Sequence, residues 1–367
     1  MIRLWCIQVL AIIRLEMKKT FFARRGLWVY LLAFAPLALF VTHSIAAGHH
    51  RDQLERIARD HPISSEAFSD IQAGMTRDEV TQKLGRPYSQ WNRHTRNEHN
   101  EPREWSHWRY TDGKIELHLF FEDDKLTGIR RSELDTLPEV ARIFAGVFQS
   151  YYLRLAVFFG CVGVFVNLFR GERLDKSLHF YLLTPTRREV LLAGKYLAGL
   201  LATVVIFTSS TALQWLALLW QFDHTAVADF LTSPTRSGAA GTGWGQFSSY
   251  LAVTALACVG YGSVFLAVGL LFRNPIIPVA VVLLWEGVNP FLPAALKKIS
   301  MIYYLQSLCP VAAAPGQDVP GLVHLLISPV QPATKAVAVL SIVILTCVVL
   351  VVGARLSRRM EINYSTE

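Results

Sequence analysis

The chain has 367 residues, of which 52% are hydrophobic and 17% are charged, and its mean hydropathy is positive. This apolar share is larger than one soluble core can bury, which excludes an ordinary soluble protein and indicates a polytopic membrane protein. The net charge of +8 does not indicate nucleic-acid binding, because the Lys and Arg residues cluster at the ends of the apolar runs and form no single basic domain.

Residues 2–22 combine scattered apolar side chains with Arg14, Lys18 and Lys19. The segment is too short and too charged to span a bilayer, so we predict a helix that lies in the cytoplasmic interface. A solvated leader without a defined role is the alternative. The residues from Lys18 onward also resemble a signal peptide, but the apolar run that follows is longer than such a segment requires. We therefore expect 1–47 to hold an interfacial helix and an uncleaved first span.

The apolar runs define the membrane part. A bilayer core of about 30 Å needs about 20 apolar residues per helix. We predict an all-α membrane protein with six spans, at 27–47, 152–170, 191–220, 248–272, 276–295 and 335–354. The positive-inside rule assigns four basic groups to the cytoplasm, with both termini inside. These groups lie at 14–25, at 170–195, at Arg273 and at 355–359.

Residues 48–142 are polar and too numerous for a connecting loop, so we predict a folded insert on the outer face. Thr76-Arg77-Asp78-Glu79 is a capping box that predicts a helix start, and Gly85 followed by Pro87 predicts its end. Alternating segments and turn residues then predict a β-meander. Its strands and turns follow in the order 105–110, Asp112-Gly113, 114–121, Asp123-Asp124 and 126–129. The expected insert is a small α+β domain.

The order within this insert is similar to that of the BamE/SmpA-like domain. The similarity covers 70–131 and is carried by Gly74-Met75-Thr76, by Leu84-Gly85-Arg86-Pro87 and by the aromatic strands that follow. No cysteine lies in or just before the insert to carry a lipid anchor, so we expect the flanking spans to tether it, and the family's partner contacts do not transfer. The resemblance nevertheless favours an envelope protein as a partner of 48–142.

A distinctive order of signals follows the second span. Arg170-Gly171-Glu172-Arg173 leads into leucines at four-residue spacing, and Pro185 ends the segment. A helix here would turn Leu174, Leu178 and Leu182 to one side and its charges to the cytosol. Such a short amphipathic rod is what a groove on a partner protein grips. Ordinary positive-inside charge is the alternative interpretation.

Together with Arg187-Arg188 and Gly194-Lys195, this order resembles the permease subunits of type-2 ATP-binding-cassette (ABC-2) transporters. The resemblance extends over 143–367, with 170–190 as the coupling loop, and to the opening motif at 14–21. It implies an inner-membrane permease, mostly of the exporter class, that pairs with a second permease subunit as a homo- or heterodimer. It also implies a separate ATPase that contacts Glu172, Arg173, Leu174, Leu178, Leu182, Pro185, Arg187, Arg188 and Lys195.

Catalytic and cofactor motifs are scarce. The sequence holds no Gly-x-x-x-x-Gly-Lys-Ser/Thr loop, so we expect ATP to be bound by the partner and this chain to be no enzyme and to hold no cofactor. The histidines at 49, 50, 94, 99, 107 and 118 lack metal-ligand spacing and are expected at the surface, without a metal.

Glu286 is the one carboxylate well inside an apolar run. Because an ionised group in hydrocarbon is costly, it either lines the translocation pathway or the dimer seam, or bonds a helix opened by Pro290. Both interpretations stay open at this point. A non-transporting envelope scaffold whose insert binds another protein is the alternative function, and a membrane-embedded hydrolase has no supporting dyad.

Overall fold

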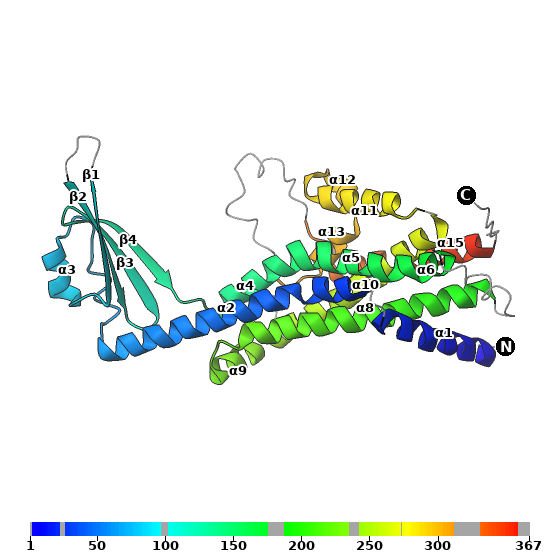
Figure 1. Ribbon diagram of the computed structural model, residues 1–367, viewed down its shortest axis with the longest axis horizontal. Coiled ribbons are helices and arrows are strands. Elements are labelled where there is room, and N and C mark those ends of the chain that lie inside the picture. Colours follow the sequence, from blue (N-terminus) through cyan, green and yellow to red (C-terminus); the bar gives the residue numbers. More distant parts are fainter. Residues whose placement is uncertain are drawn as a thin grey trace. The chain divides into compact units, whose positions relative to one another are not determined.

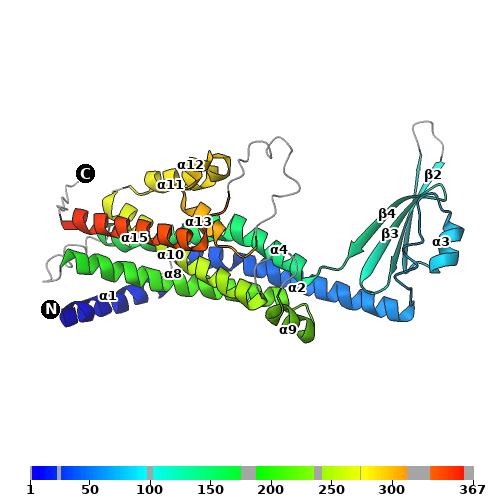
Figure 2. The same ribbon diagram turned by 180° about the vertical axis from the view of Figure 1, so that it is seen from behind.

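The fold is seen in a computed structural model of the chain (Figures 1 and 2). It describes residues 2–22, 26–96, 102–174, 187–234, 242–272, 274–311 and 331–358. The chain divides into two compact units, of which one is Thr42–Glu139 and the other combines Met1–Val41 with Val140–Glu367. The first unit is a small sheet domain and the second is a bundle of helices.

A four-stranded antiparallel sheet in the order β1-β2-β3-β4 forms the centre of the Thr42–Glu139 unit. Its strands are β1 (Ser89–Arg96), β2 (Pro102–Thr111), β3 (Ile115–Glu122) and β4 (Lys125–Glu133). The short helix α3 (Arg77–Leu84) precedes the strands, and the last part of α2 (Leu27–Asp60) also belongs to this unit. The predicted helix followed by a meander is confirmed.

The local signals of the insert act as predicted. The Thr76 hydroxyl accepts a hydrogen bond from the Glu79 amide, and the Glu79 carboxylate accepts one from the Thr76 amide at 2.9 Å. Gly85 ends α3 with a φ of +77°, a conformation that glycine adopts at little cost. Strand β1 was not predicted, because Ser89–Arg96 holds one aromatic residue among polar ones and shows no apolar alternation.

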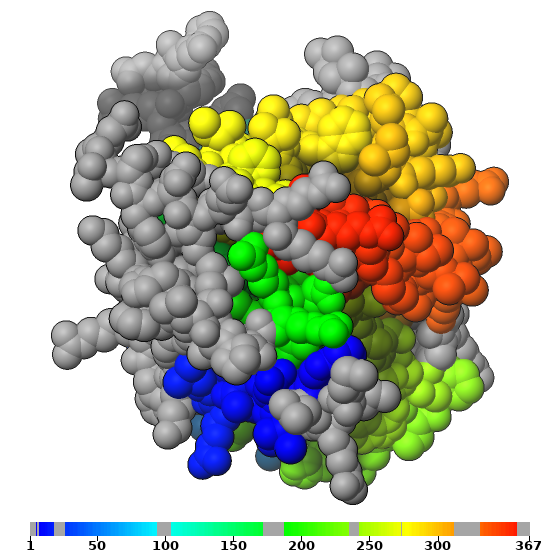
Figure 3. Space-filling view, turned by 90° about the vertical axis from the view of Figure 1, so that its right-hand side faces the viewer, coloured from blue at the N-terminus to red at the C-terminus, as the bar shows by residue number. Residues whose placement is uncertain are grey.

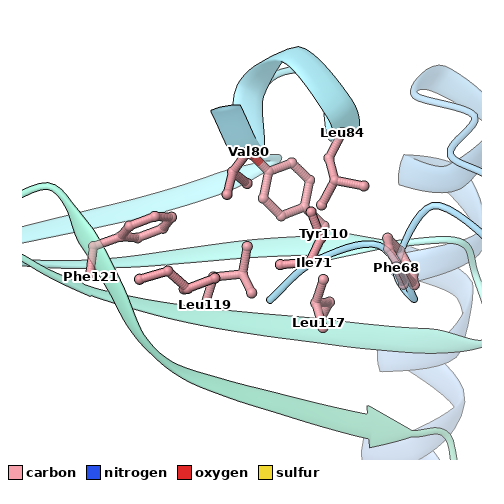
Figure 4. Packing of buried hydrophobic residues seen from close by; sticks show 9 residues of the cluster. Phe68, Ile71, Val80, Leu84, Tyr110, Leu117, Leu119 and Phe121 are labelled. Atoms are coloured by element: carbon pink, nitrogen blue, oxygen red, sulfur yellow. The ribbon is translucent and has the colours of Figure 1, made fainter. Parts of the chain in front are cut away.

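One face of the sheet carries the core of this unit (Figure 4). Val80 and Leu84 of α3 point toward Tyr110, Leu117 and Leu119 of the strands. Apolar burial of this kind contributes roughly 1.5–3 kcal/mol for each large side chain. The remaining members of the cluster are Phe68, Ile71, Phe121 and Leu126.

The bundle holds most of the apolar sequence. Among the described residues, five helical runs are long and apolar enough to cross a membrane. They cover Leu27–Asp60, Leu137–Gly171, Arg188–Leu219, Gly243–Leu271 and Lys335–Ser357. In the element labels, the last three correspond to α8 (Arg188–Leu219), α10 (Gly243–Leu271) and α15 (Lys335–Arg358), while the short α9 (His224–Thr232) lies between α8 and α10.

The predicted span at 276–295 does not form one long helix. Helix α11 (Ile276–Val288) has 13 residues, or about 20 Å at 1.5 Å per residue, and a single 3₁₀ turn, η4 (Asn289–Phe291), follows it. The reason is Pro290, since proline disfavours helix at the residue before it and lacks an N–H to continue the ladder. Short helices α12 (Ala294–Lys297) and α13 (Met301–Ser307) come next, so the six predicted spans are not confirmed.

The run Leu137–Gly171 lies in one continuous helix that has two wider π-helical stretches. It consists of α4 (Leu137–Val147), η2 (Phe148–Val157), α5 (Phe158–Cys161), η3 (Val162–Val166) and α6 (Asn167–Leu174). Glycines allow its close packing, because a Cβ on Gly160 would overlap the Phe207 ring of α8. Small residues at helix contacts are typical of membrane bundles.

Several chain segments meet at one end of the bundle. The Arg188 guanidinium at the start of α8 donates to the Ser357 carbonyl near the end of α15 at 3.0 Å. Helix α1 (Ile2–Phe22) packs along the first turns of α8. Figure 3 looks onto this end, where α8 in green lies between α1 in blue and α15 in red.

Candidate coupling site

Three elements border the predicted coupling loop 170–190. Helix α6 carries the chain into it, α8 carries the chain out of it, and α1 lies against α8. Most of the loop, 175–186, lies outside the described residues. The predictions for Leu178, Leu182 and Pro185 therefore fall outside them, and for Glu172, Arg173 and Leu174 only the backbone of α6 is described.

Lys195 is the best-defined of the predicted site residues. Its side chain is 0% exposed, and its ammonium group lies 2.7 Å from Glu16 Oε1 of α1. The same nitrogen donates to the Leu168 carbonyl of α6 at 3.0 Å and lies 5.4 Å from the centre of the Phe169 ring. One buried cation thus joins α1, α6 and α8.

Glu16 is as deeply placed as its partner, with 3% of the residue exposed. A buried charge is tolerated when it is paired and hydrogen-bonded, and removing one partner leaves the other uncompensated. Neighbouring Gly194 makes room for the contact, since a Cβ there would lie 2.9 Å from Ile12 Cγ2 on α1. The ion pair and the close approach at Gly194 therefore both hold α1 against the first turns of α8.

The two arginines that precede Lys195 also hold neighbouring elements. The Arg187 guanidinium lies 5.1 Å from the centre of the Trp5 ring of α1, a cation–π contact. Arg188 reaches α15 through the bond to Ser357. The structure thus places Arg187, Arg188 and Lys195 at one end of the bundle, where Arg187 and Lys195 contact α1 and Arg188 contacts α15.

The Lys195 ammonium group donates to the Glu16 carboxylate and to the Leu168 carbonyl, so it links α8 to both α1 and α6. Sequence reasoning singled out Lys195 but not its partner. The two residues are 179 positions apart, and no local period connects them. The sequence did contain a signal for this partner. Lysine is almost never fully buried unless it is paired, and Glu16 is the only acidic residue before Asp52.

Glu286 lies away from this group. Its carboxylate accepts hydrogen bonds from the Ser300 hydroxyl at 2.7 Å, from the Met301 amide at 3.0 Å and from the Ile302 amide at 2.9 Å. These amides form the first turn of α13, where a negative charge is stabilised by the helix dipole. Glu286 therefore fastens α11 to the start of α13, and its predicted place on a pathway or dimer seam stays a prediction.

No family model and no curated protein matches the chain.

Proposed function

We propose that the chain is the membrane-spanning permease subunit of an exporter-type ATP-binding-cassette transporter, driven by a separate ATPase at 170–190. The proposal rests on the ordered signals of that loop in the sequence and on the residues that border it. This chain supplies the pathway, and its partner binds and hydrolyses ATP.

The observation that carries the proposal is the buried Glu16–Lys195 pair with its third contact at Leu168. A push on the loop acts on its two ends, α6 and α8. Because one ammonium group fastens both ends to α1, the three elements would move as one body. Interiors packed in this way transmit displacement and do not absorb it.

The segment after α10 would complete the sixth passage as a broken helix. The chain leaves α10 beside the end of η3, since a Cβ on Gly269 would lie 2.9 Å from Val166 Cα. It enters α15 at the opposite end, because Ser357 at the far end of α15 bonds Arg188. We therefore expect the segment that begins with α11 and α13 to cross the membrane between these two ends. In this arrangement both chain termini are cytoplasmic and the Thr42–Glu139 unit is extracytoplasmic.

A transporter of this class needs a second permease subunit. The exposed leucine, isoleucine and valine side chains on α11 and α15 form an apolar surface for that subunit and for lipid.

The envelope scaffold remains the second candidate function. It is favoured by Trp91 and Trp105 on the sheet, which are 57% and 40% exposed, because large exposed aromatic side chains are typical of protein contacts.

The test is the accessibility of single cysteines in right-side-out spheroplasts, in a background whose native cysteines are replaced by serine. Ser177→Cys lies in the loop, and Ser65→Cys is an exposed position of the insert. A membrane-impermeant maleimide should label Ser65→Cys in intact spheroplasts and Ser177→Cys only after permeabilisation. Labelling of Ser177→Cys in intact spheroplasts would refute the proposed function.

A further inference from the structure

A cluster of ionisable side chains lies on the sheet face opposite the core of Figure 4. Side chains alternate across a strand, so Trp105, His107 and Arg109 of β2 share this face while Trp108 and Tyr110 face the core. Glu116 of β3 lies at the centre of the cluster and is only 6% exposed. The sequence did not indicate the cluster, because its members come from α2, from Tyr88 just before β1, and from β2 and β3.

Four groups surround the Glu116 carboxylate. The Tyr88 hydroxyl donates to Oε1 at 2.5 Å, and Arg109 Nη1 and His118 Nε2 lie 3.5 and 3.6 Å from the same oxygen. His50 Nε2 of α2 lies 3.3 Å from Oε2. Burial alone would raise the pKa of Glu116, but the Tyr88 hydrogen bond and the charges of His118, His50 and Arg109 lower it below its ordinary value.

The second nitrogen of His118 makes a contact that depends on protonation. His118 Nδ1 lies 3.0 Å from His107 Nε2, and the His107 ring stacks on Phe120 with ring centres 4.6 Å apart. A hydrogen bond between two imidazoles needs one donor and one acceptor. The pair can therefore hold one extra proton, because one ring still offers an acceptor nitrogen. If both rings were imidazolium, two N–H groups would face each other and no hydrogen bond could form.

The surrounding charges oppose a second proton. Arg109 lies beside the pair, and Arg130 of β4 stands opposite His118 in the register, while Glu116 is the single carboxylate among these contacts. Burial, His118 and Arg109 together lower the pKa of His107. Among the described side chains, no three of the His, Cys, Asp or Glu type are arranged to hold a metal ion, which leaves the proton as the ligand these groups fit.

We propose that His107 and His118, held by Glu116, form a proton-responsive switch in the insert. Near neutral pH the pair is closed and His107 covers Phe120. In acid the second proton breaks the His107–His118 bond and turns His107 away, which loosens β2 from β3 on this face. The switch does not depend on the proposed transport function.

The direction in which pH changes the stability of the insert follows from the linkage between proton binding and folding. A histidine whose pKa is lowered in the folded state binds protons less readily than in the opened state, so folding stability falls as pH drops below 6.5, the ordinary value. Between pH 7.5 and pH 5.0 this effect is separated from Glu116, whose ordinary value is 4.5 and whose folded pKa is lower still.

Hydrogen exchange read by mass spectrometry, on the full chain in nanodiscs and corrected for the intrinsic rate, tests the switch. Peptides that cover 105–111 and 115–121 should exchange on the order of tenfold faster at pH 5.0 than at pH 7.5, which corresponds to about 1.4 kcal/mol. His107→Gln retains a donor toward His118 but cannot titrate, and should abolish the acid response. His61→Gln, at an exposed histidine of the same unit, should leave it unchanged.

An acid response of His107→Gln equal to that of the wild type would overturn the switch, as would a wild type without one. If His107→Gln fails to fold, ¹³C-labelled histidine in the wild-type chain gives the decision. The His107 ring should then titrate below the ordinary imidazole value, because burial and the neighbouring His118 lower its pKa. A His107 ring that titrates at the ordinary imidazole value would contradict the proposal.

Discussion

Replacing Lys195 by methionine tests the join between α1, α6 and α8. Methionine keeps the length and apolar stem of the lysine but removes the ammonium group from the Glu16 carboxylate at 2.7 Å. Because Glu16 is 3% exposed, its charge is left buried and unpaired, which costs about 3–5 kcal/mol. The Leu168 carbonyl also loses its donor, at a cost of about 1–3 kcal/mol.

The assay is hydrogen exchange of the α1 amides in nanodiscs. Lys195→Met should speed exchange on the order of a hundredfold or more, since each 1.4 kcal/mol is about a factor of ten. The double variant with Glu16→Leu removes both charges and should recover most of the loss, because an apolar pair can replace a buried ion pair at little cost. Lys298→Met, at an exposed lysine, serves as the control.

Two results would refute this reasoning. One is an α1 helix that exchanges at the wild-type rate in Lys195→Met. The other is a double variant whose loss equals the sum of the two single losses, since residues that do not interact give additive effects.

Three further predictions concern other contacts. Glu286→Gln weakens the hydrogen bonds to the first turn of α13, a loss of about 1–3 kcal/mol, and should speed hydrogen exchange there on the order of tenfold. Unchanged protection of these amides would count against Glu286 as the group that fastens α11 to α13. Thr76→Ala should lower the unfolding free energy of the insert by about 1 kcal/mol, while Thr76→Ser should stay near wild type in the same denaturant titration. Gly262→Val would overlap the Phe165 ring and should cost about 1–3 kcal/mol in thermal unfolding, whereas Gly171→Ala meets open space and should be neutral.

Local patterns predicted much of the fold. The capping box at Thr76, the glycine that ends α3 and the turns at Gly113 and Asp123 depend on neighbours within a few residues, so the sequence contains the whole signal. The apolar runs predicted five helices of membrane length for the same reason. At 276–295 a count of apolar residues was misleading, because Pro290 ends the helix whatever the hydropathy around it.

The sites depended on contacts that no local pattern encodes. Lys195 was predicted from its loop, but Glu16 reaches it only because α1 folds back along α8. His50, His107 and His118 were expected as separate surface residues, and they meet because strand register and α2 place them around Glu116. The leucines of the coupling loop lie outside the described residues, so their role stays a prediction.

ATP hydrolysis that accompanies the purified chain tests the central claim most directly. The tagged chain is isolated from its own membranes in mild detergent, and vanadate-sensitive hydrolysis is measured beside Leu178→Asp and Lys298→Met variants. The account predicts ATP hydrolysis with the wild type and with Lys298→Met. With Leu178→Asp, hydrolysis should be lost or should no longer be regulated by the permease, because a carboxylate replaces an apolar contact in the proposed groove. A chain that brings no ATPase with it, or a Leu178→Asp variant that behaves as wild type, would contradict the account.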